Sequence, residues 1–128
     1  QEQITQERAA AEQQKVTLTP EEQALLASSI FCEAGNQPYE GQVAVGAVIL
    51  NRVKSGSYPN SVAEVIYQPG QFGPAMTGWL DTVLASGSYT PTAMQAAVDA
   101  AAGSNPIGDC LYFGNGDYGI LIGDHYFH

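Results

Sequence analysis

Apolar side chains recur at three- and four-residue spacings through the first third of the chain. Residues 19–22 (Thr-Pro-Glu-Glu) have the composition of a helix N-cap with a capping box. Leu26 and Ile30 continue the helical spacing, and Gly35 interrupts it. A second helix is predicted from about Tyr39 to Arg52, and residues 43–50 at its centre are apolar on every side. Because a helix without a polar face is a buried one, we expect this second helix at the centre of the domain.

Shorter elements follow. Short helices are predicted over 61–67 and 77–85, separated by an irregular loop at 68–74 that is rich in Gly and Pro. A helix over 90–102 has Met94, Val98 and Ala101 as its apolar stripe.

The pattern changes after Pro106, where residues 110–113, 118–122 and 124–128 favour strands around a turn signal at 114–117. The sequence therefore predicts an α+β domain with a helical N-terminal part and a small C-terminal antiparallel β-meander. The prediction divides the chain into a linker or solvated helical arm over residues 1–18 and one globular domain over 19–128, because the first residues are rich in Gln, Glu and Ala and have almost no apolar stripe.

Charge narrows the possible functions. The chain has 128 residues, 13 acidic side chains and 4 Lys or Arg, for a net charge of −9. Such a balance excludes nucleic acid and anionic membrane surfaces as partners, and no apolar run approaches the roughly 18 residues of a membrane span. A polymer or small molecule bound by hydrogen bonds and stacking fits better. The chain starts at Gln1 without a signal sequence, so either a signal has been removed or the sequence is a fragment, and we expect an exported, extracytoplasmic protein.

The most informative side chain is Glu33, which falls on the stripe of Leu26 and Ile30 in the last turn of the first helix. Burial disfavours an ionised carboxylate, and so does the partial negative charge at a helix C-terminus. Both effects raise the pKa of Glu33, and a protonated Glu near neutral pH is what a general acid requires. A buried Glu satisfied by hydrogen bonds to a neighbouring loop is the alternative interpretation.

The two cysteines and two histidines are candidates for a nucleophile, a disulfide or a metal site. Cys32 and His125 could form a nucleophilic pair, but a thiol at a helix C-terminus has a raised pKa and is a poor nucleophile. Cys32 and Cys110 either form one disulfide or stay as buried free thiols, and both interpretations are open. His125 and His128 lie at the end of the chain with weak ligand spacing, so we predict neither a metal site nor another cofactor.

A glycosidase with two carboxylates would need a second acid near Glu33. The candidates are Glu40, which also reads as a stabiliser of the first turn of its helix, Asp117 and Asp124. A single protonated Glu without a clear partner instead favours lytic transglycosylation, in which an internal hydroxyl of the sugar closes onto the anomeric carbon.

The stretches 32–45 and 48–53 resemble the cell wall hydrolases of the spore-cortex-lytic SleB/CwlJ type, as do residues 58–62, 65–67, 70–72 and 122–127. The resemblance covers about residues 22 to 127. It implies a fold similar to that of lysozymes and lytic transglycosylases, and cleavage of peptidoglycan between N-acetylmuramic acid and N-acetylglucosamine. It also implies that the family's catalytic glutamate is Glu33, that its Gln-Phe loop is Gln71-Phe72, and that its C-terminal histidine is His125.

We therefore predict a secreted peptidoglycan lytic transglycosylase with Glu33 as acid and then base. Five further residues are predicted to bind substrate: Glu40, Gln71, Phe72, Tyr112 and His125. Phe72 could equally fill the core. A hydrolytic muramidase or glucosaminidase and a catalytically silent peptidoglycan-binding module are the alternatives.

Overall fold

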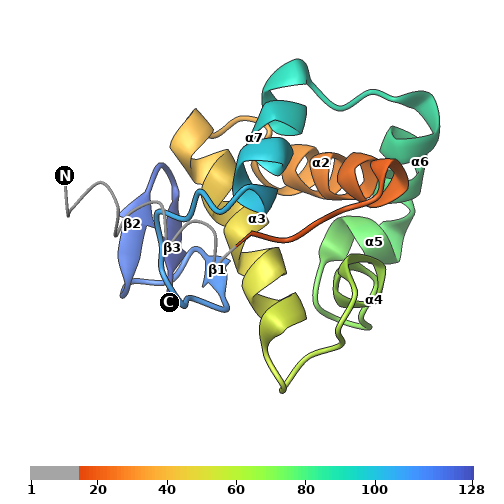
Figure 1. Cartoon of the computed structure of the whole chain (residues 1–128). Coiled ribbons are helices and arrows are strands. Elements are labelled where there is room, and N and C mark those ends of the chain that lie inside the picture. Colours follow the sequence, from red (N-terminus) through yellow and green to blue (C-terminus); the bar gives the residue numbers. More distant parts are fainter. Residues whose placement is uncertain (1–14) are drawn as a thin grey trace, which may run out of the picture.

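The computed structural model describes residues 15–128, which form helices first and a small sheet last. The elements are α2 Pro20–Ala34, α3 Tyr39–Lys54, α4 Val62–Ile66, α5 Gly73–Thr77, α6 Trp79–Ser86, α7 Pro91–Ala101, β1 Phe113–Gly114, β2 Ile120–Ile122 and β3 His125–Phe127. Figure 1 shows the sheet at one end of the molecule and α4, α5 and α6 at the other, with α3 between them. The α+β class predicted from the sequence is confirmed.

Helix α3 is the central element, as its all-round apolar sequence predicts. Every residue from Gly41 to Leu50 is buried, and α2, α4 and α7 pack against the helix. Gly46 permits the closest approach: a Cβ atom there would lie 3.1 Å from the Ala100 Cβ of α7 and 3.1 Å from the Ile30 Cδ1 of α2. These three helices therefore meet with almost no side-chain volume between α3 and α7.

That close approach explains why the predicted packing stripe of α7 is wrong. The buried residues of α7 are Ala93, Ala96, Ala97 and Ala100. Val98 is exposed and Met94 is only partly buried. Methyl side chains fit a narrow interhelical gap, whereas a stripe of larger residues would force the helices apart.

The first helix begins and ends as predicted, although Gly35 does not have the usual conformation of a glycine cap. The Thr19 hydroxyl accepts a hydrogen bond from the Glu22 amide at 3.1 Å, and the Glu22 carboxylate accepts one from the Thr19 amide at 2.9 Å, which completes the capping box. Gly35 follows the last turn but keeps right-handed angles of φ −60° and ψ −22°, so the helix does not end on a left-handed glycine. A Cβ at Gly35 would lie 2.6 Å from the Phe31 carbonyl oxygen, so this position requires the absence of a side chain.

The three-stranded sheet is antiparallel but is not a meander. Its order is β1-β3-β2, with Phe113 opposite Phe127 and Leu121 opposite Tyr126. The predicted pairing of the first two strands across the 114–117 turn therefore does not form. Phe127, which is fully buried, lies on the strand that gains hydrogen-bonded neighbours on both sides.

One shorter helix also differs from the prediction. Helix α5 begins at Gly73, inside the loop predicted to be irregular. Residues 15–18 have no helical structure; the Val16 amide donates to the Ala101 carbonyl at 2.8 Å, and Val16 and Leu18 pack against the core. The rest of the predicted arm, residues 1–14, lies outside the described residues.

Candidate functional site

Glu33 lies in the last complete turn of α2 and is half-buried, between the fully buried Ile30 and Ala34 and the polar turn that follows. The last turn of α2 contains no basic residue. Within residues 15–128 the Glu33 carboxylate has no hydrogen bond or ion pair. The alternative interpretation, a buried Glu satisfied by a neighbouring loop, therefore has no support among the described residues.

These surroundings raise the pKa of Glu33 above its ordinary value, and burial is the cause. The negative end of the α2 dipole acts in the same direction. The sequence predicted this direction from the position of Glu33 alone. A carboxyl group with a raised pKa keeps its proton to higher pH than an ordinary Glu, which favours the role of a general acid.

The turn that follows Glu33 is fixed to the sheet. The Gln37 side-chain oxygen accepts a hydrogen bond from the Asp124 amide at 2.9 Å, and its nitrogen donates to the Asp124 carboxylate at 3.1 Å. On the other side, the buried Gln42 side chain of α3 donates to the Gln37 carbonyl at 3.1 Å. The α2–α3 turn is thereby held between the second helix and the β2–β3 turn, which restricts the position of Glu33.

The Asp124 carboxylate accepts a hydrogen bond in this link, so it is a structural partner of Gln37.

The Cys32 thiol, which precedes Glu33 in the chain, is also unreactive at neutral pH. Burial and the charge of Glu33 raise the pKa of Cys32 to about 11, so at neutral pH it is a thiol rather than a nucleophilic thiolate. Both Cys32 and Cys110 are free in the structure, and the bridge that the sequence left open is not formed there.

Arg52, at the end of α3, gathers three of the predicted substrate-binding residues. The Arg52 residue is 4% exposed, and its Nη1 donates to the Gln71 side-chain oxygen at 3.1 Å. Its guanidinium also lies 5.2 Å from the Phe72 ring centre and 5.4 Å from that of Tyr112. The sequence analysis placed Arg52 at the end of the second helix but did not identify it as the centre of this cluster.

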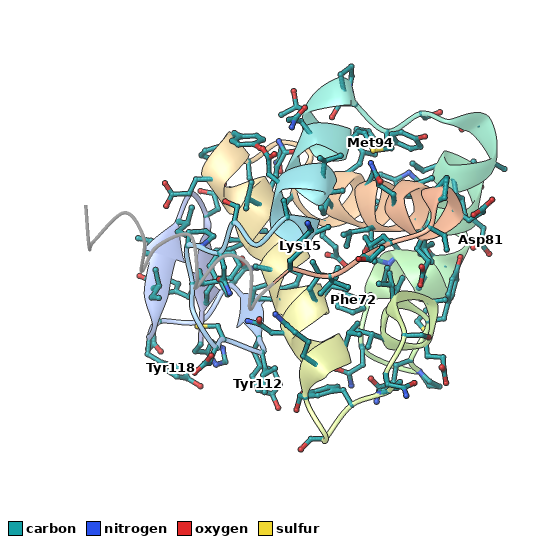
Figure 2. The ribbon with its side chains drawn as sticks, in the orientation of Figure 1. Lys15, Phe72, Asp81, Met94, Tyr112 and Tyr118 are labelled. Carbon is teal, nitrogen blue, oxygen red and sulfur yellow. The ribbon has the colours of Figure 1, made fainter. Side chains whose placement is uncertain are left out.

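Phe72 occupies a core position, which is the second of its two predicted roles. It is 4% exposed and stacks on Phe113 with ring centres 6.2 Å apart. His125 packs edge-on against the same Phe113 at 5.4 Å, and its Nδ1 atom is buried without a partner among the described residues. Figure 2 shows Phe72 inside the molecule, and Tyr112 with Tyr118 at the edge of the sheet. Gln71 and Tyr112 are exposed, so they are the members of this cluster that a ligand can reach.

Glu40 lies apart from the Arg52 cluster. It is exposed in the first turn of α3 and lines a cleft of about 460 Å³ together with Tyr39, Val43 and residues 104–106. The Tyr39 hydroxyl at this cleft donates a hydrogen bond to Asp99. Nothing in this geometry pairs Glu40 with Glu33 as a second catalytic carboxylate.

A separate cleft of about 400 Å³ lies at the end of α2, against residues that flank Glu33 in the chain. Its lining residues are Phe31, Cys32, Gly35, Asn36 and Trp79. The sequence analysis missed Trp79, although a lone tryptophan directly after a glycine was a visible signal.

Across residues 15–128, no three His, Cys, Asp or Glu side chains are grouped as metal ligands, and no helix is long and apolar enough to cross a membrane.

Comparison with known protein families gives a match that begins close to the candidate site. A family model described as cell wall hydrolase matches residues 36–120. The match begins three positions after Glu33, so it includes the α2–α3 turn and α3 but not the candidate acid itself.

Curated relatives are spore cortex-lytic enzymes. The enzyme from Bacillus cereus is 44% identical over 97 residues, which are 73% of this chain and 34% of the relative. The enzyme from Bacillus subtilis is 43% identical over 97 residues, covering 73% of this chain and 29% of the relative. The chain thus spans about a third of the length of these relatives.

Solved structures agree over nearly their whole length. The catalytic domain of the germination-specific lytic transglycosylase SleB from Bacillus anthracis superposes with a TM-score of 0.74 at 35% identity, covering 86% of this chain and 95% of that domain. The catalytic domain of Bacillus cereus SleB gives a TM-score of 0.76 at 35% identity, with coverages of 87% and 91%. The predicted lytic-transglycosylase-like fold is confirmed.

Proposed function

We propose, from the premise that this chain belongs to the cell wall hydrolase family, that it cleaves the glycan strand of peptidoglycan as a lytic transglycosylase. The proposed bond lies between N-acetylmuramic acid and N-acetylglucosamine. The proposed catalytic domain is residues 19–128, and its place of action is extracytoplasmic. The observation that carries the proposal is the half-buried Glu33 carboxylate, whose pKa is raised by burial.

The chemistry follows from one carboxyl group acting twice. Protonated Glu33 gives its proton to the glycosidic oxygen, and the bond between that oxygen and the anomeric carbon of muramic acid breaks. The resulting Glu33 carboxylate then takes the proton of an internal hydroxyl of the same sugar, whose oxygen bonds to the anomeric carbon. The products are an anhydro-muramyl end and a free hydroxyl on the leaving sugar. Glu33 is protonated again, and no water is consumed.

Two features support a single-acid mechanism. The Asp124 carboxylate is bonded to Gln37, and Glu40 lines a different cleft. The neighbour described as a lytic transglycosylase covers almost the same domain, which supports the same outcome for this chain. Gln71, Tyr112 and His125 are proposed to contact more distant parts of the strand.

The test is digestion of purified peptidoglycan followed by mass spectrometry of the released muropeptides. Anhydro-muramyl ends are the expected products. Reducing ends would replace the transglycosylase by a hydrolytic muramidase or glucosaminidase. Binding of peptidoglycan without release would replace it by a silent binding module. A parallel digestion with Glu33→Gln controls for contaminating activity.

A further inference from the structure

The cleft at the end of α2 contains an exposed aromatic side chain that the catalytic step does not use. One wall is the last turn of α2 and the turn after it, and the other wall is Trp79 at the start of α6. Cys32, Gly35 and Asn36, which flank Glu33 in the chain, all line this space. Its volume of about 400 Å³ falls within the range of roughly 300–1,000 Å³ typical of small-ligand pockets. A molecule bound there contacts the same turn of α2 that carries the candidate acid, although Glu33 is not one of the lining residues.

The orientation of Trp79 leaves its indole ring accessible to a ligand. Gly78, with φ +88°, turns the chain between α5 and α6 and directs Trp79 away from the core that buries Leu80. Phe31 contacts the indole ring edge-on, with ring centres 6.5 Å apart and an interplanar angle of 60°. The side chain remains 48% exposed, because this single edge contact leaves much of the ring uncovered. A large aromatic surface exposed inside a cleft marks a binding site more often than an isolated surface residue does.

Polar groups in the cleft match an amide-bearing ligand. The Asn36 side-chain oxygen accepts a hydrogen bond from Gln37 at 3.2 Å, which orients the Asn36 amide. Its NH₂ group has no partner within residues 15–128 and can donate to a carbonyl oxygen. The lining residues include no Lys or Arg. The cleft thus favours an uncharged ring with an acetamido group over a carboxylate-bearing peptide.

We propose that Trp79 and Asn36 form a sugar subsite at the turn that follows Glu33, and that it binds an N-acetylated hexosamine ring of the glycan strand. The apolar C–H face of the sugar stacks on the indole, and the acetamido oxygen accepts a hydrogen bond from Asn36. This inference rests on the proposed function for the identity of the polymer. It goes further than the proposed function because it names the residues that bind the sugar ring and the groups on the sugar that they contact.

The chain provides its own reporter, because Trp79 is its only tryptophan. The binding experiment uses the Glu33→Gln variant, titrated with chito-oligosaccharides and, separately, with peptidoglycan glycan strands freed of stem peptides. Saturable blue-shifted emission and protection from acrylamide quenching are expected with both ligands. Glucose oligomers, which lack the acetamido group, are expected to give a weaker response. Unchanged emission at saturating glycan strands would overturn the subsite.

Kinetics on the otherwise wild-type chain give the second readout. Trp79→Ala is expected to raise KM for glycan strands by about 5- to 100-fold, as is typical for the loss of one aromatic stacking partner, with a smaller effect on kcat. Trp79→Phe is expected to recover part of this loss. Leu121→Ala, an exposed apolar residue on β2, is the matched control and should leave KM unchanged.

The two proposals fail in different ways. If glycan strands shift the Trp79 emission but the wild-type chain releases no product, the catalytic function is refuted and the subsite stands. If the chain cleaves peptidoglycan but Trp79→Ala keeps the wild-type KM, the subsite is refuted and the function stands.

Discussion

Replacement of Glu33 by Gln separates a catalytic role from a structural one, because the structure predicts opposite effects on activity and on stability. Gln has nearly the same shape as Glu but cannot donate an acidic proton. Within residues 15–128 the Glu33 carboxylate has no hydrogen bond that the substitution would break. What the substitution removes from the folded protein is a charge that burial disfavours.

The expected loss of activity follows from general acid–base catalysis. A positioned acid or base contributes about 10²- to 10⁴-fold to rate, or about 2.7 to 5.4 kcal/mol of transition-state stabilisation. Because Glu33 is proposed to act in both steps, we expect kcat to fall toward the upper end of this range. Binding of glycan strands should be retained.

The expected change in stability has the opposite sign. Burial raises the Glu33 pKa above its ordinary value of 4.5, so the folded state binds the proton more tightly than the unfolded state does. Wild-type stability therefore falls as pH rises from about 4.5 through the folded-state pKa, and is unaffected by this group below 4.5. The Glu33→Gln variant has no carboxyl group to ionise at this position, so its stability does not fall in this way as pH rises. It should match the wild type at pH 4 and exceed it at pH 8 by about 1 kcal/mol or less, because partial exposure reduces the effect.

Both quantities can be measured on the same preparations. Release of anhydro-muropeptides gives the activity, and urea denaturation at pH 4, 6 and 8 gives the free energy of unfolding. Glu21→Gln, an exposed carboxylate at the opposite end of α2, serves as the control for the loss of one negative charge. Wild-type activity in Glu33→Gln would refute the catalytic assignment. Lower stability than the wild type at pH 8 would refute the account of its environment.

Three further predictions concern the framework around the site. Arg52→Lys keeps a buried charge but loses the planar fork and its ring contacts, so a loss of about 2–4 kcal/mol in urea denaturation is expected, and wild-type stability would contradict it. Gly46→Ala should lower stability by about 1–3 kcal/mol through overpacking. Gly56→Ala, where a Cβ meets nothing within 4 Å, is its control, and equal thermal midpoints would refute the tight packing. Thr19→Ala should cost about 1 kcal/mol through loss of the helix cap, whereas the exposed Thr17→Ala should cost almost nothing; equal losses would argue against the cap.

Features determined by local chemistry were predictable from the sequence. The Thr19 capping box and the extent of α3 depend on residues close together in the chain, and the burial of α3 and the raised pKa of Glu33 were indicated by the apolar periodicity of the same stretches. These are cases in which periodicity and capping act without competition from distant contacts.

Features determined by distant contacts were not predictable. The alanine face of α7 depends on how closely α3 approaches, which only the assembled core determines. The order of the sheet depends on which strand buries its side chains, and the local turn signal at 114–117 does not contain that information. For the same reason, the sequence indicated Gln71, Phe72 and Tyr112 separately, but not the Arg52 guanidinium that joins them.

The link between Gln37 and Asp124 has a consequence for biosynthesis. It joins positions 87 residues apart, near opposite ends of the globular domain. During translation, α2 and its carboxyl group emerge long before the residue that anchors the turn beside them. The chain therefore cannot anchor the turn after Glu33 to the sheet until Asp124 has been synthesised, and nascent fragments that lack the last strand should be less active even though they contain the acid.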